Sequence, residues 1–92
     1  MESSFSIRSK IVEIGRRMYE KDLVAATDGN ISFRIADDRI VITPSGSCLG
    51  YLKPTGMVTV DFDGNVQGRG TPTSEYRLHL EVYRNRADVR AV

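Results

Sequence analysis

The chain has 92 residues, of which 40% are hydrophobic and 27% charged, and its formal net charge is +1. This length excludes more than one small domain, the near-neutral charge gives no electrostatic case for nucleic acid, and no run approaches the roughly 18 apolar residues of a membrane span. Cys48 is the only cysteine, which excludes a disulfide framework and a cysteine-based zinc site and favours a reducing, cytoplasmic setting.

An amphipathic helix is predicted over residues 7–21. Its apolar stripe recurs at the helical period and consists of Ile7, Ile11, Ile14 and Met18. Ser6 is a candidate N-cap for this helix. Gly15 lowers the helix propensity and is a candidate for close packing against a neighbouring segment.

Four short strands are predicted after this helix, at 31–35, 39–43, 57–62 and 65–68. Each is short, and apolar side chains alternate with polar ones in the first three, as in half-buried strands. The acidic turn at 36–38 predicts an antiparallel hairpin, and Asp63-Gly64 predicts a two-residue hairpin turn. Between the second and third strands, Pro54 limits any helix to about one turn.

A second helix is predicted from Tyr76 to Arg86, with Thr73 or Ser74 as its cap and Glu75 in its first turn. Its apolar side chains form a wide surface, which predicts burial on more than one side: Tyr76, Leu78, His79, Leu80, Val82 and Tyr83. The last residues, 89–92, begin another strand. This order of elements predicts one α/β domain over 1–92, with a largely antiparallel sheet and flanking helices in α/β/α layers.

Three loops are rich in small, hydrogen-bonding residues, at Gly29-Asn30, Ser45-Gly46 and Thr73-Ser74. Each loop enters or leaves a strand or helix, so all three are candidates to meet at one edge of the sheet. Hydroxyls, an amide and free backbone N–H groups can hold a phosphate without a net positive charge. Each loop alone reads as an ordinary turn; together, beside Glu75, they predict a candidate anion site.

These segments resemble the class II aldolase/adducin family, and within it the fuculose-phosphate aldolase branch. The resemblance lies in four motifs in the same order: Gly29-Asn30-Ile31-Ser32, Thr43-Pro44-Ser45-Gly46, Pro72-Thr73-Ser74-Glu75 and Leu78-His79. It covers the chain from about Gly29 to Val92. It implies the fold of the N-terminal part of that family's domain, incomplete in this chain.

The resemblance also implies residue roles. The substrate phosphate would be held by Gly29, Asn30, Ser45, Gly46, Thr73 and Ser74. Glu75 would be the general acid/base and, in the resting enzyme, a metal ligand. His79 matches a helix histidine that does not bind metal, and a lone histidine on an apolar stripe is more often a hydrogen-bonded core residue.

The family's zinc site has three histidines, and none of them is in this sequence. The expectation is therefore that the chain is truncated before the His-x-His pair, holds zinc weakly or not at all, and is inactive on its own. In the intact enzyme, zinc would stabilise the enediolate that forms when a ketose phosphate is cleaved.

The leading hypothesis is a zinc-dependent aldolase that cleaves a small, fuculose-phosphate-like ketose phosphate to dihydroxyacetone phosphate and an aldehyde. A homotetramer is implied by the resemblance. Family dehydratases and decarboxylases remain alternatives, and so does an adducin-like interaction domain without catalysis. The 4-epimerases of the family usually carry aspartate at the position of Glu75, which favours the aldolase over them.

Overall fold

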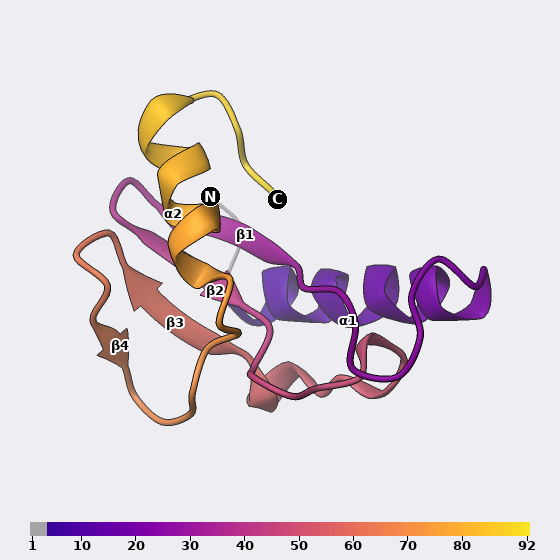
Figure 1. The fold of residues 1–92 in the computed structure, drawn as a ribbon. Helices are drawn as coiled ribbons and strands as arrows, with labels where there is room; N and C mark the ends of the chain where they lie inside the picture. The colour runs from indigo at the N-terminus through magenta and orange to yellow at the C-terminus, as the bar shows by residue number, and fades with distance from the viewer. Residues whose placement is uncertain (1–3) are drawn as a thin grey trace.

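A computed structural model describes residues 4–92, so the part of the domain prediction that concerns residues 1–3 lies outside it. A four-stranded antiparallel sheet of order β1-β2-β3-β4 separates two helices that cover its opposite faces (Figure 1). The elements are α1 (Ser4–Glu20), β1 (Ser32–Ala36), β2 (Arg39–Ile42), β3 (Val58–Asp61), β4 (Val66–Gln67) and α2 (Tyr76–Asn85). The predicted α/β/α layers and antiparallel sheet are confirmed.

The strand β2 is buried on both faces of the sheet. Ile40 and Ile42 pack with Leu80 of α2, whereas Val41 packs with Ile11 of α1. These three residues of β2 are 0% exposed. Successive side chains of a strand point to opposite faces, so one short strand supplies both cores.

The predicted hairpin between the first two strands is confirmed, with Ser32 opposite Ile42 and an irregularity between Arg34 and Ala36. Two short 3₁₀ turns, Leu49–Tyr51 and Pro54–Gly56, connect β2 to β3. The limit on helix length near Pro54 is thus confirmed. No helix among residues 4–92 is long and apolar enough to cross a membrane.

The helix α1 differs from its predicted stripe. Its buried residues are Ile7, Ile11 and Gly15, and Ile14 is 43% exposed. At Gly15, α1 packs closely against Leu49 and Leu52, in and just after the first 3₁₀ turn. Because α1 makes this close contact at Gly15, its buried side runs along Ile7, Ile11 and Gly15 and does not include Ile14. The helix also begins before Ser6, so Ser6 is not its N-cap.

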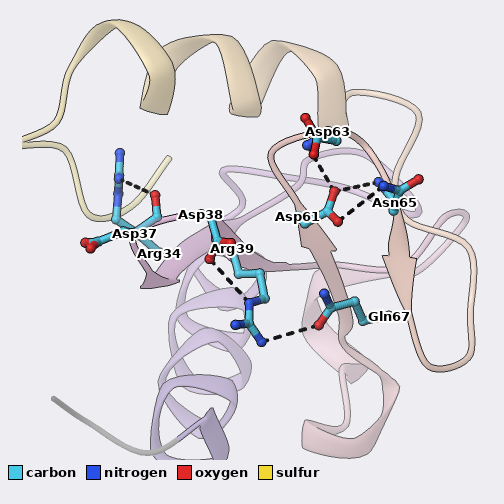
Figure 2. A network of polar contacts seen from close by, with 8 residues as sticks. All are labelled: Arg34, Asp37, Asp38, Arg39, Asp61, Asp63, Asn65 and Gln67. Carbon is cyan, nitrogen blue, oxygen red and sulfur yellow. Dashed lines mark hydrogen bonds and ion pairs between the residues drawn. The ribbon is translucent and has the colours of Figure 1, made fainter.

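The connection between β3 and β4 is longer than the predicted two-residue turn. The N–H of Asp61 donates to the carbonyl of Asn65, which leaves residues 62–64 as a three-residue loop. The Asp61 carboxylate accepts from the N–H groups of Asp63 and Asn65 at 3.0 and 2.9 Å (Figure 2). The hydrogen bond from the Asn65 backbone is the largest cause of a lowered Asp61 pKa. The side chain of Asp61 therefore organises this loop.

The helix α2 begins at Tyr76 with Glu75 in the N-cap position, and neither Thr73 nor Ser74 caps it as predicted. Thr73 is held through its backbone. Its N–H donates to the carbonyl of Thr43, and its carbonyl accepts from the N–H of Tyr76. The helix buries one side, through His79, Leu80 and Tyr83. Leu78 is 61% exposed, so the prediction that α2 is buried on more than one side is wrong within residues 4–92.

Residues 90–92 lie along the outer edge of β1, which agrees with the predicted start of a strand. Phe33 and Ala91 form an antiparallel bridge. The N–H groups of Ser32 and Arg34 donate to the carbonyls of Val92 and Arg90, at 2.9 and 2.8 Å. The C-terminal end of the chain thus runs beside β1 (Figure 1).

The packing of Gly15 predicts that Gly15→Ala destabilises the chain although alanine is the better helix former. A Cβ at this position would lie 2.6 Å from the carbonyl oxygen of Leu49. Overpacking of this kind costs about 1–3 kcal/mol, against a gain of about 1 kcal/mol in helix propensity. We expect the free energy of unfolding, measured by urea denaturation, to fall.

The matched control is Gly56→Ala, where a Cβ would meet nothing within 4 Å. That variant should change the free energy of unfolding by no more than about 0.5 kcal/mol. A Gly15→Ala chain as stable as the original would contradict the proposed close contact.

Candidate active site

The segment after β2 and the segment before α2 run side by side. Pro44 and Pro72 form an antiparallel bridge. On either side of it, the N–H of Ser45 donates to the carbonyl of Thr71 at 2.8 Å, and the N–H of Thr73 donates to the carbonyl of Thr43 at 3.0 Å. Two of the three candidate loops are thus joined by backbone hydrogen bonds.

The Gly29-Asn30 loop joins the other two through Thr43 and His79. The Thr43 hydroxyl accepts from the N–H of Ile31 at 3.2 Å, and the Thr43 N–H donates to the carbonyl of Ile31 at 3.0 Å. The side chain of Asn30 is hydrogen-bonded to Nε2 of His79, one turn into α2. All three loops therefore meet at one end of the sheet, as predicted.

Most of the candidate site residues face solvent there. Gly29, Ser45, Gly46, Ser74 and Glu75 are exposed, and Asn30 and Thr73 are half-buried. Within residues 4–92, the backbone N–H groups of Ser74 and Glu75 have no acceptor. Free N–H groups at the start of a helix are suited to binding an anion.

Of the three hydroxyls in the second loop, two are hydrogen-bonded within the fold and one is exposed. Thr43 is 1% exposed and bonded to the Ile31 backbone, and the Ser47 hydroxyl donates to the carbonyl of Pro44 at 2.8 Å. Only Ser45 among these three is exposed. It is therefore the hydroxyl of this loop that a ligand can reach.

The two candidate glycines are needed for different reasons. Gly29 has a φ of +87°, and a Cβ there would lie 2.9 Å from a methyl of Val24. Gly46 has a φ of +70°, but a Cβ there would meet nothing within 4 Å. A left-handed backbone favours glycine at both positions. The space beside Gly46 additionally leaves its backbone open to a ligand.

His79 lies in a buried polar network that includes two residues not singled out as site residues from the sequence. Nδ1 of His79 is 2.6 Å from the Ser32 hydroxyl, which is 2.7 Å from the Tyr83 hydroxyl. His79 is only 3% exposed, and burial lowers its pKa. The negative charge of Glu75 raises the pKa but does not cancel this shift. The prediction of a hydrogen-bonded core histidine is confirmed. Ser32 belongs to the Gly29-Asn30-Ile31-Ser32 motif, but no role in the site was predicted for it from the sequence.

The residues present do not form a metal site. Across residues 4–92, no three His, Cys, Asp or Glu side chains are grouped so that they could hold a metal ion. Glu75, the candidate ligand, is an exposed carboxylate, and one carboxylate does not make a zinc site. The described chain by itself therefore does not fit the zinc centre that the resemblance implies.

An open depression of about 420 Å³ lies elsewhere, between α2 and the β3–β4 loop. It is lined by Asp63, Gly64, Tyr76, Arg77, Leu80, Glu81 and Arg84. None of the candidate site residues lines it. The depression is therefore separate from the place where the three loops meet.

Comparison with known proteins agrees with this fold and arrangement of loops. Residues 9–92 match the family described as the class II aldolase and adducin N-terminal domain. This match covers most of the chain, so the chain belongs to the class II aldolase and adducin family.

Relatives carry several activities. The chain is 41% identical over 85 residues to an L-fuculose phosphate aldolase of Methanocaldococcus jannaschii, a match that covers 92% of this chain and 46% of that protein. It is 45% identical over 83 residues to a methylthioribulose-1-phosphate dehydratase of Gluconacetobacter diazotrophicus, covering 89% of this chain and 40% of the dehydratase. A solved structure of L-fuculose 1-phosphate aldolase superposes with a TM-score of 0.86 at 35% identity, covering 99% of this chain and 43% of that one. The chain thus spans less than half the length of each.

The lowered pKa of His79 predicts a specific dependence of stability on pH. The unfolded chain takes up a proton at its histidine below about pH 6.5, whereas burial in the folded chain keeps the imidazole neutral to a lower pH. Stability from this residue is therefore fully present above about pH 6.5 and falls as the pH drops toward the folded pKa. We expect urea denaturation to show this fall between about pH 7 and pH 5.

The matched control is His79→Gln, which removes the only histidine of the chain. The fall should be smaller in that variant over the same range. Equal slopes in the two proteins would mean that His79 does not titrate differently in the folded and unfolded states.

Proposed function

We propose that the intact protein to which this chain belongs is a class II aldolase, an aldehyde-lyase. Its substrate would be a small, fuculose-phosphate-like ketose phosphate, cleaved to dihydroxyacetone phosphate and an aldehyde. The observation that carries this proposal is the meeting of three donor-rich loops beside Glu75, joined by the Pro44–Pro72 bridge and the Asn30–His79 hydrogen bond. The 41% identity to an L-fuculose phosphate aldolase supports it.

The phosphate of the substrate would be held by the exposed donors of the three loops. The side chains of Asn30, Ser45, Thr73 and Ser74 offer an amide and hydroxyls. Gly29 permits the left-handed backbone of its loop, and Gly46 keeps the backbone accessible. The N–H groups at the start of α2 add a favourable dipole. This set suits a phosphate because phosphate oxygens accept hydrogen bonds from all of these groups.

Glu75 would serve as the general acid/base. It is an exposed carboxylate at the N-cap of α2, next to Thr73 and Ser74, which are proposed to donate hydrogen bonds to the phosphate. A carboxylate held beside a bound substrate can transfer a proton between the reacting oxygen and carbon. The proposal assigns Glu75 this role and, in the resting enzyme, that of a metal ligand.

A zinc requirement is proposed for the intact protein alone. Residues 4–92 do not provide a zinc site, so its other ligands would have to come from outside these residues. A homotetramer and a cytoplasmic setting are likewise proposals, resting on the family resemblance and the single cysteine.

A dehydratase is the second candidate function. It is favoured by the 45% identity to a methylthioribulose-1-phosphate dehydratase, which is higher than the identity to the aldolase. A dehydratase releases water and leaves the carbon chain intact, whereas an aldolase splits it. Product analysis of the intact protein on a panel of ketose phosphates would separate the two. The same panel would reveal an epimerase or a decarboxylase, and no turnover of any member would favour an adducin-like interaction domain.

The role of Glu75 predicts that Glu75→Gln in the intact protein lowers kcat by about 100-fold or more, because general acid–base catalysis contributes factors of this size. A retro-aldol assay with steady-state kinetics measures this. The matched control is Glu81→Gln, an exposed carboxylate on the same helix that lines the separate depression. An unchanged rate for Glu75→Gln on every cleaved substrate would rule out the proposed role.

The absence of a grouped ligand set in residues 4–92 predicts that the 92-residue chain holds zinc weakly or not at all. Elemental analysis after dialysis should find much less than one zinc per chain. Tight, stoichiometric zinc would contradict the inference that Glu75 alone does not hold the metal.

A further inference from the structure

Four polar side chains form a continuous buried relay that connects α2 to the Gly29-Asn30 loop. We define the buried relay as Tyr83, Ser32, His79 and Asn30. The Tyr83 hydroxyl lies 2.7 Å from the Ser32 hydroxyl, which lies 2.6 Å from Nδ1 of His79. Nε2 of His79 is hydrogen-bonded to Oδ1 of Asn30. Three of these residues are buried, and Asn30 at the end is half-buried.

The chemistry of Asn30 determines the direction of every hydrogen bond in the relay. An amide oxygen only accepts, so Nε2 of His79 must carry the proton and donate to Oδ1. A neutral imidazole has a single N–H, so Nδ1 accepts from the hydroxyl of Ser32. The Ser32 oxygen then accepts from the hydroxyl of Tyr83. One arrangement of protons accounts for all three hydrogen bonds of the relay.

This arrangement fixes which end of the Asn30 amide is available to a ligand. Its oxygen is used by His79, whereas its NH₂ group has no acceptor among residues 4–92. If the amide were turned over, Asn30 would present its oxygen to a ligand. An exposed amide oxygen repels the oxygens of a phosphate, and an NH₂ group donates to them.

We propose that His79 is a positioning residue that holds the Asn30 amide with its NH₂ group toward the ligand. This inference rests on the proposed function, because it takes Asn30 to bind the substrate phosphate. His79 does not touch the ligand and acts only through Asn30. The relay thereby biases the site toward a group whose oxygens only accept hydrogen bonds.

The test is a double-mutant cycle in the intact protein, with inorganic phosphate as the probe and isothermal titration calorimetry as the readout. Asn30→Ala should weaken phosphate binding by about tenfold, the effect expected for a hydrogen bond to a charged group. His79→Leu should weaken it by about twofold or more, because the released amide can then turn its oxygen toward the ligand. In the Asn30→Ala background, His79→Leu should have no further effect, since it acts through Asn30. His79→Gln keeps an N–H donor for Asn30 and should restore most of the affinity.

The outcomes separate this inference from the proposed function. If Asn30→Ala weakens phosphate binding but His79→Leu does not, or if the two effects add, the positioning role is wrong and the phosphate site stands. If Asn30→Ala leaves phosphate affinity unchanged, the proposed phosphate role of Asn30 fails and the positioning role fails with it.

A second measurement needs no substitution and so holds even if His79→Leu does not fold. Nitrogen-15 NMR of the imidazole in the unmodified intact protein reports which ring nitrogen carries the proton. We expect the proton on Nε2 at neutral pH. A proton on Nδ1 would mean that the Asn30 amide is turned over, and would overturn the inference.

Discussion

The backbone of Thr43 is the junction on which the arrangement of loops depends. Its N–H donates to the carbonyl of Ile31, and its carbonyl accepts from the N–H of Thr73. Its hydroxyl accepts from the N–H of Ile31, and the residue is 1% exposed. These bonds are protected from water, so breaking them would leave buried polar groups unsatisfied. Thr43 directly follows β2, whose side chains pack in both cores. The place where the loops meet is therefore attached directly to the best-packed strand of the sheet.

The two ends of the sheet serve different purposes. At the end away from the candidate site, side chains hydrogen-bond to nearby groups: Asp61 binds the loop that follows it, and Arg39 contacts Asp38 and Gln67 (Figure 2). At the candidate site, exposed donors of Ser45 and Ser74 face solvent. Donors that are not used within the fold are available to a ligand. The candidate site thus lies at the end of the sheet where the exposed hydroxyls of Ser45 and Ser74 remain.

Local sequence patterns predicted the strands well and the ends of elements less well. Alternation in β3 reports burial directly, because side chains of a strand point to opposite faces. The strand β2 is instead buried on both faces. The helical stripe of α1 failed at Ile14, since that half of the helix packs on a short turn through Gly15. Likewise, no local pattern shows that the backbone of Thr73 is bonded to Thr43. Capping and turn length depend on partners that are distant in sequence.

The sequence by itself determined the class of fold, the family and the set of candidate site residues, because composition, periodicity and motif order are local properties. Only the tertiary structure decided how these residues are held. Asn30 and His79 are separated by 49 positions, yet their side chains form one hydrogen bond. Ser32 and Tyr83 became part of the buried relay for the same reason. Hydrogen bonds between buried groups depend on three-dimensional packing, and spacing along the chain does not encode them.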